Sequence, residues 1–218
     1  MCFSAPVSFI AGVTLIVIGI ATLKMTRKKS EIPFALIPLL FGAQQIVEGM
    51  LWLSFLDQEP MFNTTMTYLF TLFSHVLWPI YVPFSILMIE TVAWRKKVLW
   101  GFQLIGGGIG VYLLYSIIKY PVISFIDESM VYVLPYVRQH PAMELYLAAT
   151  CVAPLFSSHN FVRLFGVLTL VLFFAALWFY TVALFSVWCF FSAILSTLIY
   201  LHFKYIKTPT VLGVQLNS

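Results

Sequence analysis

Long runs of apolar residues alternate with short charged segments along the whole chain. The hydrocarbon core of a bilayer is about 30 Å thick, and a helix of about 20 apolar residues crosses it. The runs therefore predict seven membrane-spanning helices, over residues 8–23, 32–56, 65–89, 99–118, 143–156, 164–180 and 183–203. We expect an all-α polytopic membrane protein in which residues 1–218 form a single seven-helix bundle.

The last apolar run, from Leu164 to Leu201, contains no charged residue. As one helix it would extend about 57 Å, well beyond the hydrocarbon core, so we expect two helices joined by a turn near Trp178–Thr181. The stretch 121–141 is too polar to span, because it mixes Asp127, Glu128 and Arg138 with apolar residues. It predicts an interfacial outer loop or a short amphipathic helix.

The basic residues fall almost entirely on one side of the predicted bundle. With the N-terminus outside, Lys119 and Arg138 are the outer basic residues. The inner loops carry the rest of the 12 lysines and arginines, namely Lys24, Arg27, Lys28, Lys29, Arg95, Lys96, Lys97, Arg163, Lys204 and Lys207. Cytoplasmic loops are enriched in Lys and Arg, so the distribution predicts an N-out, C-in topology.

Composition supports a membrane protein and excludes some partners. The chain is 61% hydrophobic and 9% charged, whereas a soluble domain carries about 25% charged residues. The net charge of +4 is explained by basic cytoplasmic loops, so we expect membrane lipids and not nucleic acid as partners. The sequence leaves the oligomeric state open.

One carboxylate, Glu48, lies deep inside an apolar run. On a helix, Gln44, Gln45, Glu48 and Trp52 fall on one side. An ionisable residue within a membrane span is costly to bury, which makes Glu48 a functional-site hypothesis. The structural alternative is a protonated Glu48 that bonds to Gln45 or His75 and fixes the register of the helices.

Three other chemically reactive side chains are expected at a similar depth. At 1.5 Å per residue, Glu48 lies roughly 12 Å and His75 roughly 15 Å from the outer ends of their helices. Cys189 is in the outer half of the last helix, and Cys2 precedes the first helix on the outer side. The four residues can therefore meet in the outer half of the bundle.

Cysteine, histidine and glutamate are ligands of zinc and copper, and they also form nucleophile and base pairs. We therefore predict a transition-metal site, zinc or copper, formed by Cys2, Glu48, His75 and Cys189. Glu48 would be a base or ligand, His75 a ligand, and Cys2 a ligand or nucleophile. Packing is the alternative role of Cys189, because a free cysteine behaves as a small apolar residue.

Three short motifs add a resemblance to a known family: the opening Met1–Ala5, the Gln44–Trp52 run and Ser186–Ala193. With the seven predicted spans, they resemble a family of short bacterial membrane proteins that is classed only as a domain of unknown function. The resemblance implies a bacterial origin, and hence the inner (cytoplasmic) membrane. It implies no activity.

Three functions stay open at this point. The first is hydrolytic or redox chemistry at the metal site on a lipid-phase substrate. The second is an ion, proton or small-solute transporter or channel with Glu48 and His75 as a relay, although the inner half offers few polar residues for a continuous pore. The third is a membrane sensor or structural subunit. A retinal protein is disfavoured, because Lys204 lies at the inner end of the last helix and not at its middle.

Overall fold

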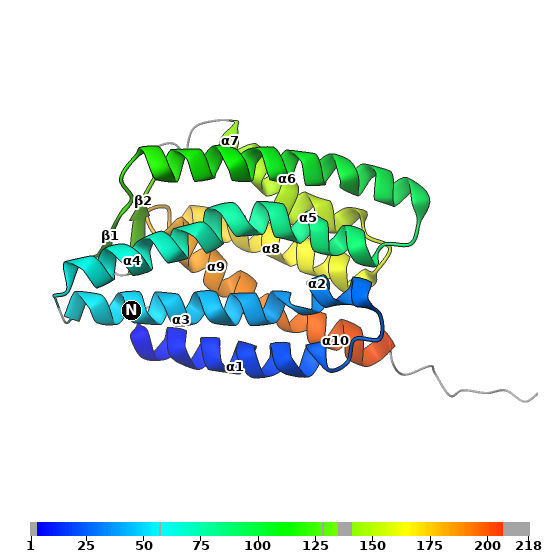
Figure 1. The fold of residues 1–218 in the computed structure, drawn as a ribbon, viewed down its shortest axis with the longest axis horizontal. Coiled ribbons are helices and arrows are strands. Elements are labelled where there is room, and N and C mark those ends of the chain that lie inside the picture. Colours follow the sequence, from blue (N-terminus) through cyan, green and yellow to red (C-terminus); the bar gives the residue numbers. More distant parts are fainter. Residues whose placement is uncertain (1–3, 57, 128, 135–140, 207–218) are drawn as a thin grey trace, which may run out of the picture.

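Helices form most of the protein (Figure 1). The computed structural model describes residues 4–56, 58–127, 129–134 and 141–206. The longest helices are α1 (Ala5–Leu23), α3 (Ile37–Leu56), α6 (Ala93–Lys119) and α8 (Asn160–Phe179). Shorter helices follow one another closely along the remaining spans: α2 (Ile32–Ala35) before α3, α4 (Pro60–Thr71) before α5 (Trp78–Ile89), and α9 (Leu184–Leu195) before α10 (Thr197–Ile206).

Six helical segments of the described chain are long and apolar enough to cross a membrane. They are Ala5–Leu23, Lys29–Leu56, Pro60–Ile89, Ala93–Lys119, Asn160–Phe179 and Leu184–Tyr205. A further apolar segment, Ala142–Phe156, is shorter and begins with α7 (Ala142–Leu147). The apolar run after Leu164 is divided between α8 and α9, as its length requires. These lengths and compositions indicate a membrane protein.

Two of these segments contain π-helical turns next to prolines. The turn η2 (Leu72–Leu77) joins α4 to α5 ahead of Pro79, and η3 (Ala148–Val152) follows α7 ahead of Pro154. A proline has no N–H, so a carbonyl one turn earlier loses its helical donor. The hydroxyl of Tyr146 donates to the free carbonyl of Ser74, which lies in η2. The turn η2 is therefore bonded to α7, the helix that leads into η3.

A β-hairpin closes one end of the bundle, where the sequence predicted a loop or a short amphipathic helix. Strand β1 (Ile123–Asp127) pairs antiparallel with β2 (Ser129–Val133), and Ile123 lies opposite Val133. The helix alternative was wrong, because β-branched and aromatic residues dominate this stretch and favour a pleated strand. Strand β2 is buried over most of its length and packs on the helices. Residues 135–140 of the predicted loop lie outside the described residues.

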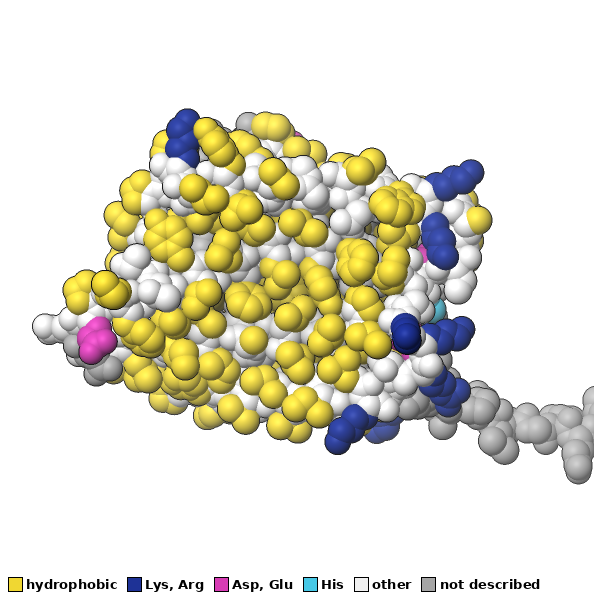
Figure 2. Space-filling model, in the orientation of Figure 1, with side chains coloured by type: hydrophobic (Ala, Val, Ile, Leu, Met, Phe, Trp, Pro, Cys, Tyr) yellow, Lys and Arg dark blue, Asp and Glu magenta, His cyan; other side chains and the backbone are white. Residues whose placement is uncertain are grey.

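The surface separates into an apolar middle and a basic end. Figure 2 shows hydrophobic side chains over the middle of the bundle and Lys and Arg side chains gathered mainly at one end. This basic end includes Arg27, Lys28, Arg95 and Lys96, and the hairpin lies at the opposite end, called the hairpin end below. An apolar belt between polar ends is the surface that a lipid bilayer requires.

Small residues allow the helices to approach closely at two places. A Cβ on Gly106 of α6 would lie 1.9 Å from the carbonyl oxygen of Pro79 in α5. A Cβ on Gly42 of α3 would lie 2.9 Å from the carbonyl oxygen of Gly12 in α1. Gly107 and Gly108 face open space, so the Gly106–Gly108 run contributes to close packing through Gly106.

Candidate functional site

Glu48 lies near the middle of α3 and is 2% exposed. Its carboxyl group accepts a hydrogen bond of 2.5 Å from the Ser186 hydroxyl of α9 and one of 3.3 Å from the Gln45 side-chain amide. In the part of the chain that the structure describes, no Lys or Arg side chain pairs with it. Glu48 is therefore a buried acid held by neutral donors.

Of the four residues on the predicted polar side of α3, three are buried and Trp52 is partly buried. Gln44, Gln45 and Glu48 are all buried, although they do not all face the same partner. Gln45 bonds to Glu48 within its own helix, whereas the Gln44 oxygen accepts a hydrogen bond of 2.7 Å from the Trp78 indole of α5. Trp78 in turn stacks on Phe41, with ring centroids 3.8 Å apart. The side chains of α3 thus connect it to both α5 and α9.

His75 lies in the π-helical turn η2 and is completely buried. Its Nδ1 pairs with the Ser74 hydroxyl at 2.7 Å, and its Nε2 has no hydrogen-bond partner among the described residues. The imidazole packs against Phe185, with ring centroids 4.2 Å apart. Because Phe185 precedes Ser186, the residue that bonds Glu48, the His75 and Glu48 sites share one wall of α9. The two residues do not hydrogen-bond directly to each other.

Cys189 is buried one turn after Ser186 on α9. Residues three apart on a helix share a face, so Ser186, Cys189 and Ser192 point into the bundle together. Within the described residues, no group of three or more His, Cys, Asp and Glu side chains could hold a metal ion. Cys2, the fourth predicted ligand, lies outside these residues. The predicted metal site is therefore not supported by Glu48, His75 and Cys189 alone.

Sequence reasoning missed the importance of Tyr132, which reaches the site from strand β2. Its hydroxyl is buried and has no hydrogen-bond partner among the described residues. Burial raises the pKa of Tyr132 well above its ordinary value, and the nearby Glu48 and Cys189 raise it further. Tyr132 therefore brings an unpaired hydroxyl within electrostatic range of Glu48. No periodic signal could have located it, because the hairpin that carries it was predicted as a loop or helix.

Ser186 and Tyr146 were also missed as site residues. Ser186 belongs to a sequence motif, but a single serine on an apolar helix is usually a packing residue. Tyr146 stands in the short segment Ala142–Phe156, and its pairing with Ser74 depends on the irregular turn before Pro79. Both contacts join residues that are far apart in the chain, so local patterns carry no information about them.

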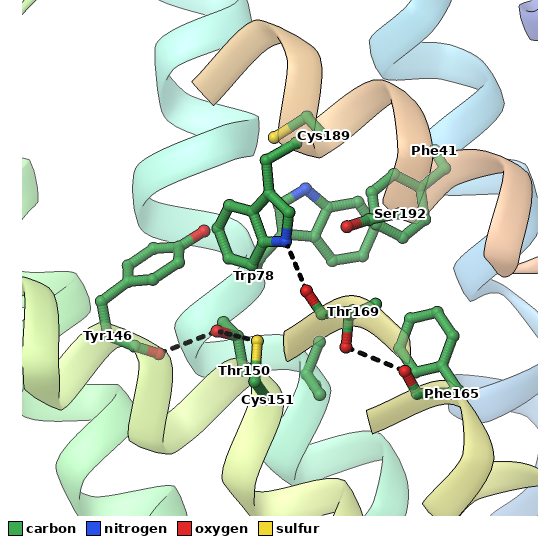
Figure 3. A pocket seen from close by; sticks show the side chains of 11 residues that line it. Phe41, Trp78, Tyr146, Thr150, Cys151, Phe165, Thr169, Cys189 and Ser192 are labelled. Atoms are coloured by element: carbon green, nitrogen blue, oxygen red, sulfur yellow. Dashed lines mark hydrogen bonds between the residues drawn. The ribbon is translucent and has the colours of Figure 1, made fainter. Parts of the chain in front are cut away.

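Two cavities border the Glu48 layer, by which we mean Glu48, His75, Tyr132, Ser186 and Cys189, although Glu48 itself lines neither of them. The cavity towards the hairpin end has a volume of about 210 Å³ and is lined in part by Tyr132 and Phe185. The other cavity is about 30 Å³ and is lined in part by Cys189 and Ser192. Figure 3 shows Cys189 and Ser192 on one side of it, facing Thr150 and Cys151. The smaller space has room for about two waters, because one water needs roughly 10–15 Å³.

Several buried polar atoms on α3, η2, β2 and α9 lack a partner among the described residues. They are Gln44 Nε2, Gln45 Oε1, Trp52 Nε1, His75 Nε2, the Tyr132 hydroxyl and the Ser192 hydroxyl. Leaving such an atom unpaired costs about 1–3 kcal/mol. A single packing site would rarely accumulate so many, since over 90% of buried polar groups are bonded. This part of the bundle thus has the hydrogen-bonding capacity of a binding site.

Comparison with known proteins identifies a family and no activity. The model of the family of unknown function DUF6629 matches residues 1–212, so the chain belongs to this family. The expected membership of a family of unknown function is confirmed, whereas the bacterial origin and the seven spans remain predictions. No curated protein and no solved structure matches the chain.

Proposed function

We propose that this member of DUF6629 is a membrane carrier in which Glu48 binds a proton or a small cation that enters from the hairpin end. We also propose that all seven helical segments cross a bacterial cytoplasmic membrane, with the basic end inside and the hairpin end outside. The gathering of Lys and Arg at the basic end supports this orientation (Figure 2).

The observation that carries the proposal is the environment of Glu48. A charged carboxylate removed from water is strongly destabilised unless a cation compensates it or a proton neutralises it. The described surroundings supply Ser186 and Gln45, which are neutral donors. An exchangeable proton or small cation is what this acid still requires, and intramembrane carboxylates commonly mark ion and proton pathways.

The cavities favour a carrier over an open channel. The space of about 210 Å³ at the hairpin end is lined in part by Tyr132, the space of about 30 Å³ is lined in part by Cys189, and Glu48 lines neither of them. A buried site to which no described cavity opens is expected of a carrier and not of an open channel. The π-helical turns η2 and η3 lie beside this layer, as discontinuous helices do in transporters.

Ion uptake into liposomes tests the proposal. Purified protein is reconstituted with a pH-sensitive dye or a sodium-sensitive dye inside, and an inward-negative potential is imposed. We expect dye-reported uptake of one of the two ions by the wild type and its loss in Glu48→Gln. The matched control is Glu59→Gln, which removes the same charge from an exposed position at the hairpin end. Equal uptake by wild type and Glu48→Gln would refute the proposal.

A transition-metal site is the second candidate, and one observation favours it: His75 Nε2, a typical zinc or copper ligand, has no partner among the described residues. Glu48 and Cys189 lie in the same layer, so Cys2 would have to complete such a site. Hydrolytic or redox chemistry on a lipid-phase substrate would follow only from a bound metal. Elemental analysis of purified protein decides it, with metal expected in the wild type and lost in His75→Ala and Cys2→Ser. Metal-free wild type, or equal metal in all three proteins, excludes this candidate.

A further inference from the structure

The basic end contains a cavity that is independent of the Glu48 layer. Its volume is about 400 Å³, and it lies where α1 leads into α2 and where α5 leads into α6. Three cationic side chains line it: Arg27, Lys28 and Lys96. The rings of His159 and His202 form another part of its wall, with their centroids 4.9 Å apart.

Two acidic residues also line this cavity, but both are committed to backbone N–H groups. The Glu31 carboxylate accepts hydrogen bonds from the backbone N–H of Arg27 at 2.7 Å and of Lys28 at 3.3 Å. The Glu90 carboxylate accepts three, from Thr91, Val92 and Ser158. Within the described chain, neither carboxylate forms an ion pair with the side chain of Arg27, Lys28 or Lys96. The positive charges therefore remain available to a ligand.

The neighbouring basic residues have different surroundings. Arg95 donates to the backbone carbonyls of Phe156 and Ser157, so it links the first turn of α6 to the chain that precedes α8. Lys29 and Lys97 are exposed and do not line the cavity. Lys96 and Lys97 are adjacent in the sequence and carry the same charge. In the fold, Lys96 lines the cavity and Lys97 does not. This difference provides internal controls of identical charge.

Apolar side chains complete the wall of the cavity, among them Met25, Met88 and Phe203. A space that combines cationic groups with an apolar wall at the ends of membrane helices matches an amphiphilic anion. Phosphate is the anion that Lys and Arg bind in such positions, and basic pockets between membrane helices bind phosphate-bearing lipid headgroups.

We propose that this basic-end cavity binds a phosphate group through Arg27, Lys28 and Lys96. The phosphate can belong to an anionic lipid headgroup, with the apolar wall against the lipid, or to a soluble phosphate compound. The inference does not depend on the proposed carrier function, because it uses other residues at the other end of the bundle.

Binding of phosphatidylglycerol, phosphatidylcholine and inorganic phosphate to the detergent-purified full chain tests this inference. Native mass spectrometry counts bound lipid, and isothermal titration calorimetry measures inorganic phosphate. We expect phosphatidylglycerol or inorganic phosphate to bind, and the better of the two identifies the source of the phosphate group. Each neutralised cation should weaken binding about fivefold, so Arg27→Gln/Lys96→Gln should weaken it about 25-fold.

The control is Lys29→Gln/Lys97→Gln, which removes the same two charges from the same end and should leave binding unchanged. Thermal unfolding of the ligand-free variants shows whether each one remains folded, and Lys96→Gln alone replaces the double variant if that one does not. An equal loss of binding in both double variants would overturn the proposal, since the effect would then be general surface charge. The proposal would also be overturned if neither phosphatidylglycerol nor inorganic phosphate bound the wild type.

Discussion

Glu48 and Glu90 are both almost completely buried, yet their surroundings are opposite. Glu90 is 1% exposed and follows the last residue of α5, where α6 and α8 begin nearby. It accepts backbone hydrogen bonds of 2.9 Å from Thr91, 3.0 Å from Val92 and 2.6 Å from Ser158. Glu48 is 2% exposed and accepts hydrogen bonds from two side chains.

The difference follows from position along a helix. Thr91, Val92 and Ser158 lie just before the first residues of α6 and α8, where backbone N–H groups have no helical partner, so Glu90 finds unused donors next to it. In the middle of α3 the backbone N–H groups are already bonded to carbonyls, so Glu48 depends on side chains. Burial raises the pKa of Glu90, but the hydrogen bonds from Val92, Ser158 and Thr91 outweigh it, and the pKa falls below its ordinary value. Glu90 is thus a structural anion, whereas the charge state of Glu48 is left to whatever binds it.

The largest effect is expected from Glu90→Gln. A glutamine offers one oxygen where the carboxylate offers two, and its NH₂ group would face a backbone donor. We expect the free energy of unfolding to fall by about 3 kcal/mol, the scale of hydrogen bonds to a charged group. Chemical unfolding in detergent, followed by tryptophan fluorescence, measures this loss. A change below about 1 kcal/mol would show that Glu90 is not the anchor that the contacts indicate.

Lowering the pH should remove the stabilisation that ionised Glu90 provides. Because the folded-state pKa of Glu90 is lowered, its contribution is complete above the ordinary pKa of 4.5 and is lost as the pH falls through the lowered folded-state value. We therefore expect wild-type stability to decline below pH 4.5, with a weaker decline in Glu90→Gln. Unfolding curves of the two proteins across this range provide the measurement, and parallel declines would assign the acid sensitivity to other groups.

A smaller loss is expected from Ser186→Ala, which removes one of the two described donors to Glu48. The cost should be about 1–2 kcal/mol, because a buried acceptor loses its closest partner. Ser192→Ala is the matched control on the same helix, since its hydroxyl has no partner within the described chain. Unfolding of both variants in detergent separates the two cases, and equal losses would mean that Ser186 contributes only packing.

The smallest effect on stability is expected from Glu48→Gln. The introduced amide can accept from Ser186, and Gln45 can rotate its amide so that its unpaired oxygen accepts from the new NH₂ group. We expect the free energy of unfolding to change by less than about 1 kcal/mol. A loss as large as that of Glu90→Gln would indicate an ionised Glu48 with a structural role, and would remove the contrast between the two acids.

The apolar helices of the bundle were predictable from the sequence, because the thickness of the hydrocarbon core fixes their length. A span needs about 20 apolar residues whatever its neighbours are. Runs such as the one after Leu164 can therefore be recognised from the local sequence. The polar side of α3 was predictable for the same reason, since residues four apart share a face of any helix. The hairpin was not predicted, because its strands are stabilised by pairing with each other and by packing on the bundle. The run from Met130 to Val133 is apolar without alternation, so it lacks the period-two signal of a strand, although its β-branched and aromatic residues favour one.

The sequence by itself determined that the chain forms apolar helices, that most basic residues lie at one end of them, and that Glu48 is buried among apolar residues. These properties depend on hydropathy and helical periodicity, which are local. The tertiary structure alone decided that Ser186 bonds Glu48, that Tyr132 approaches it from a hairpin, and that Lys96 lines a cavity while Lys97 does not. Such contacts join residues distant in the chain, so only the packing of the helices and of the hairpin brings them together.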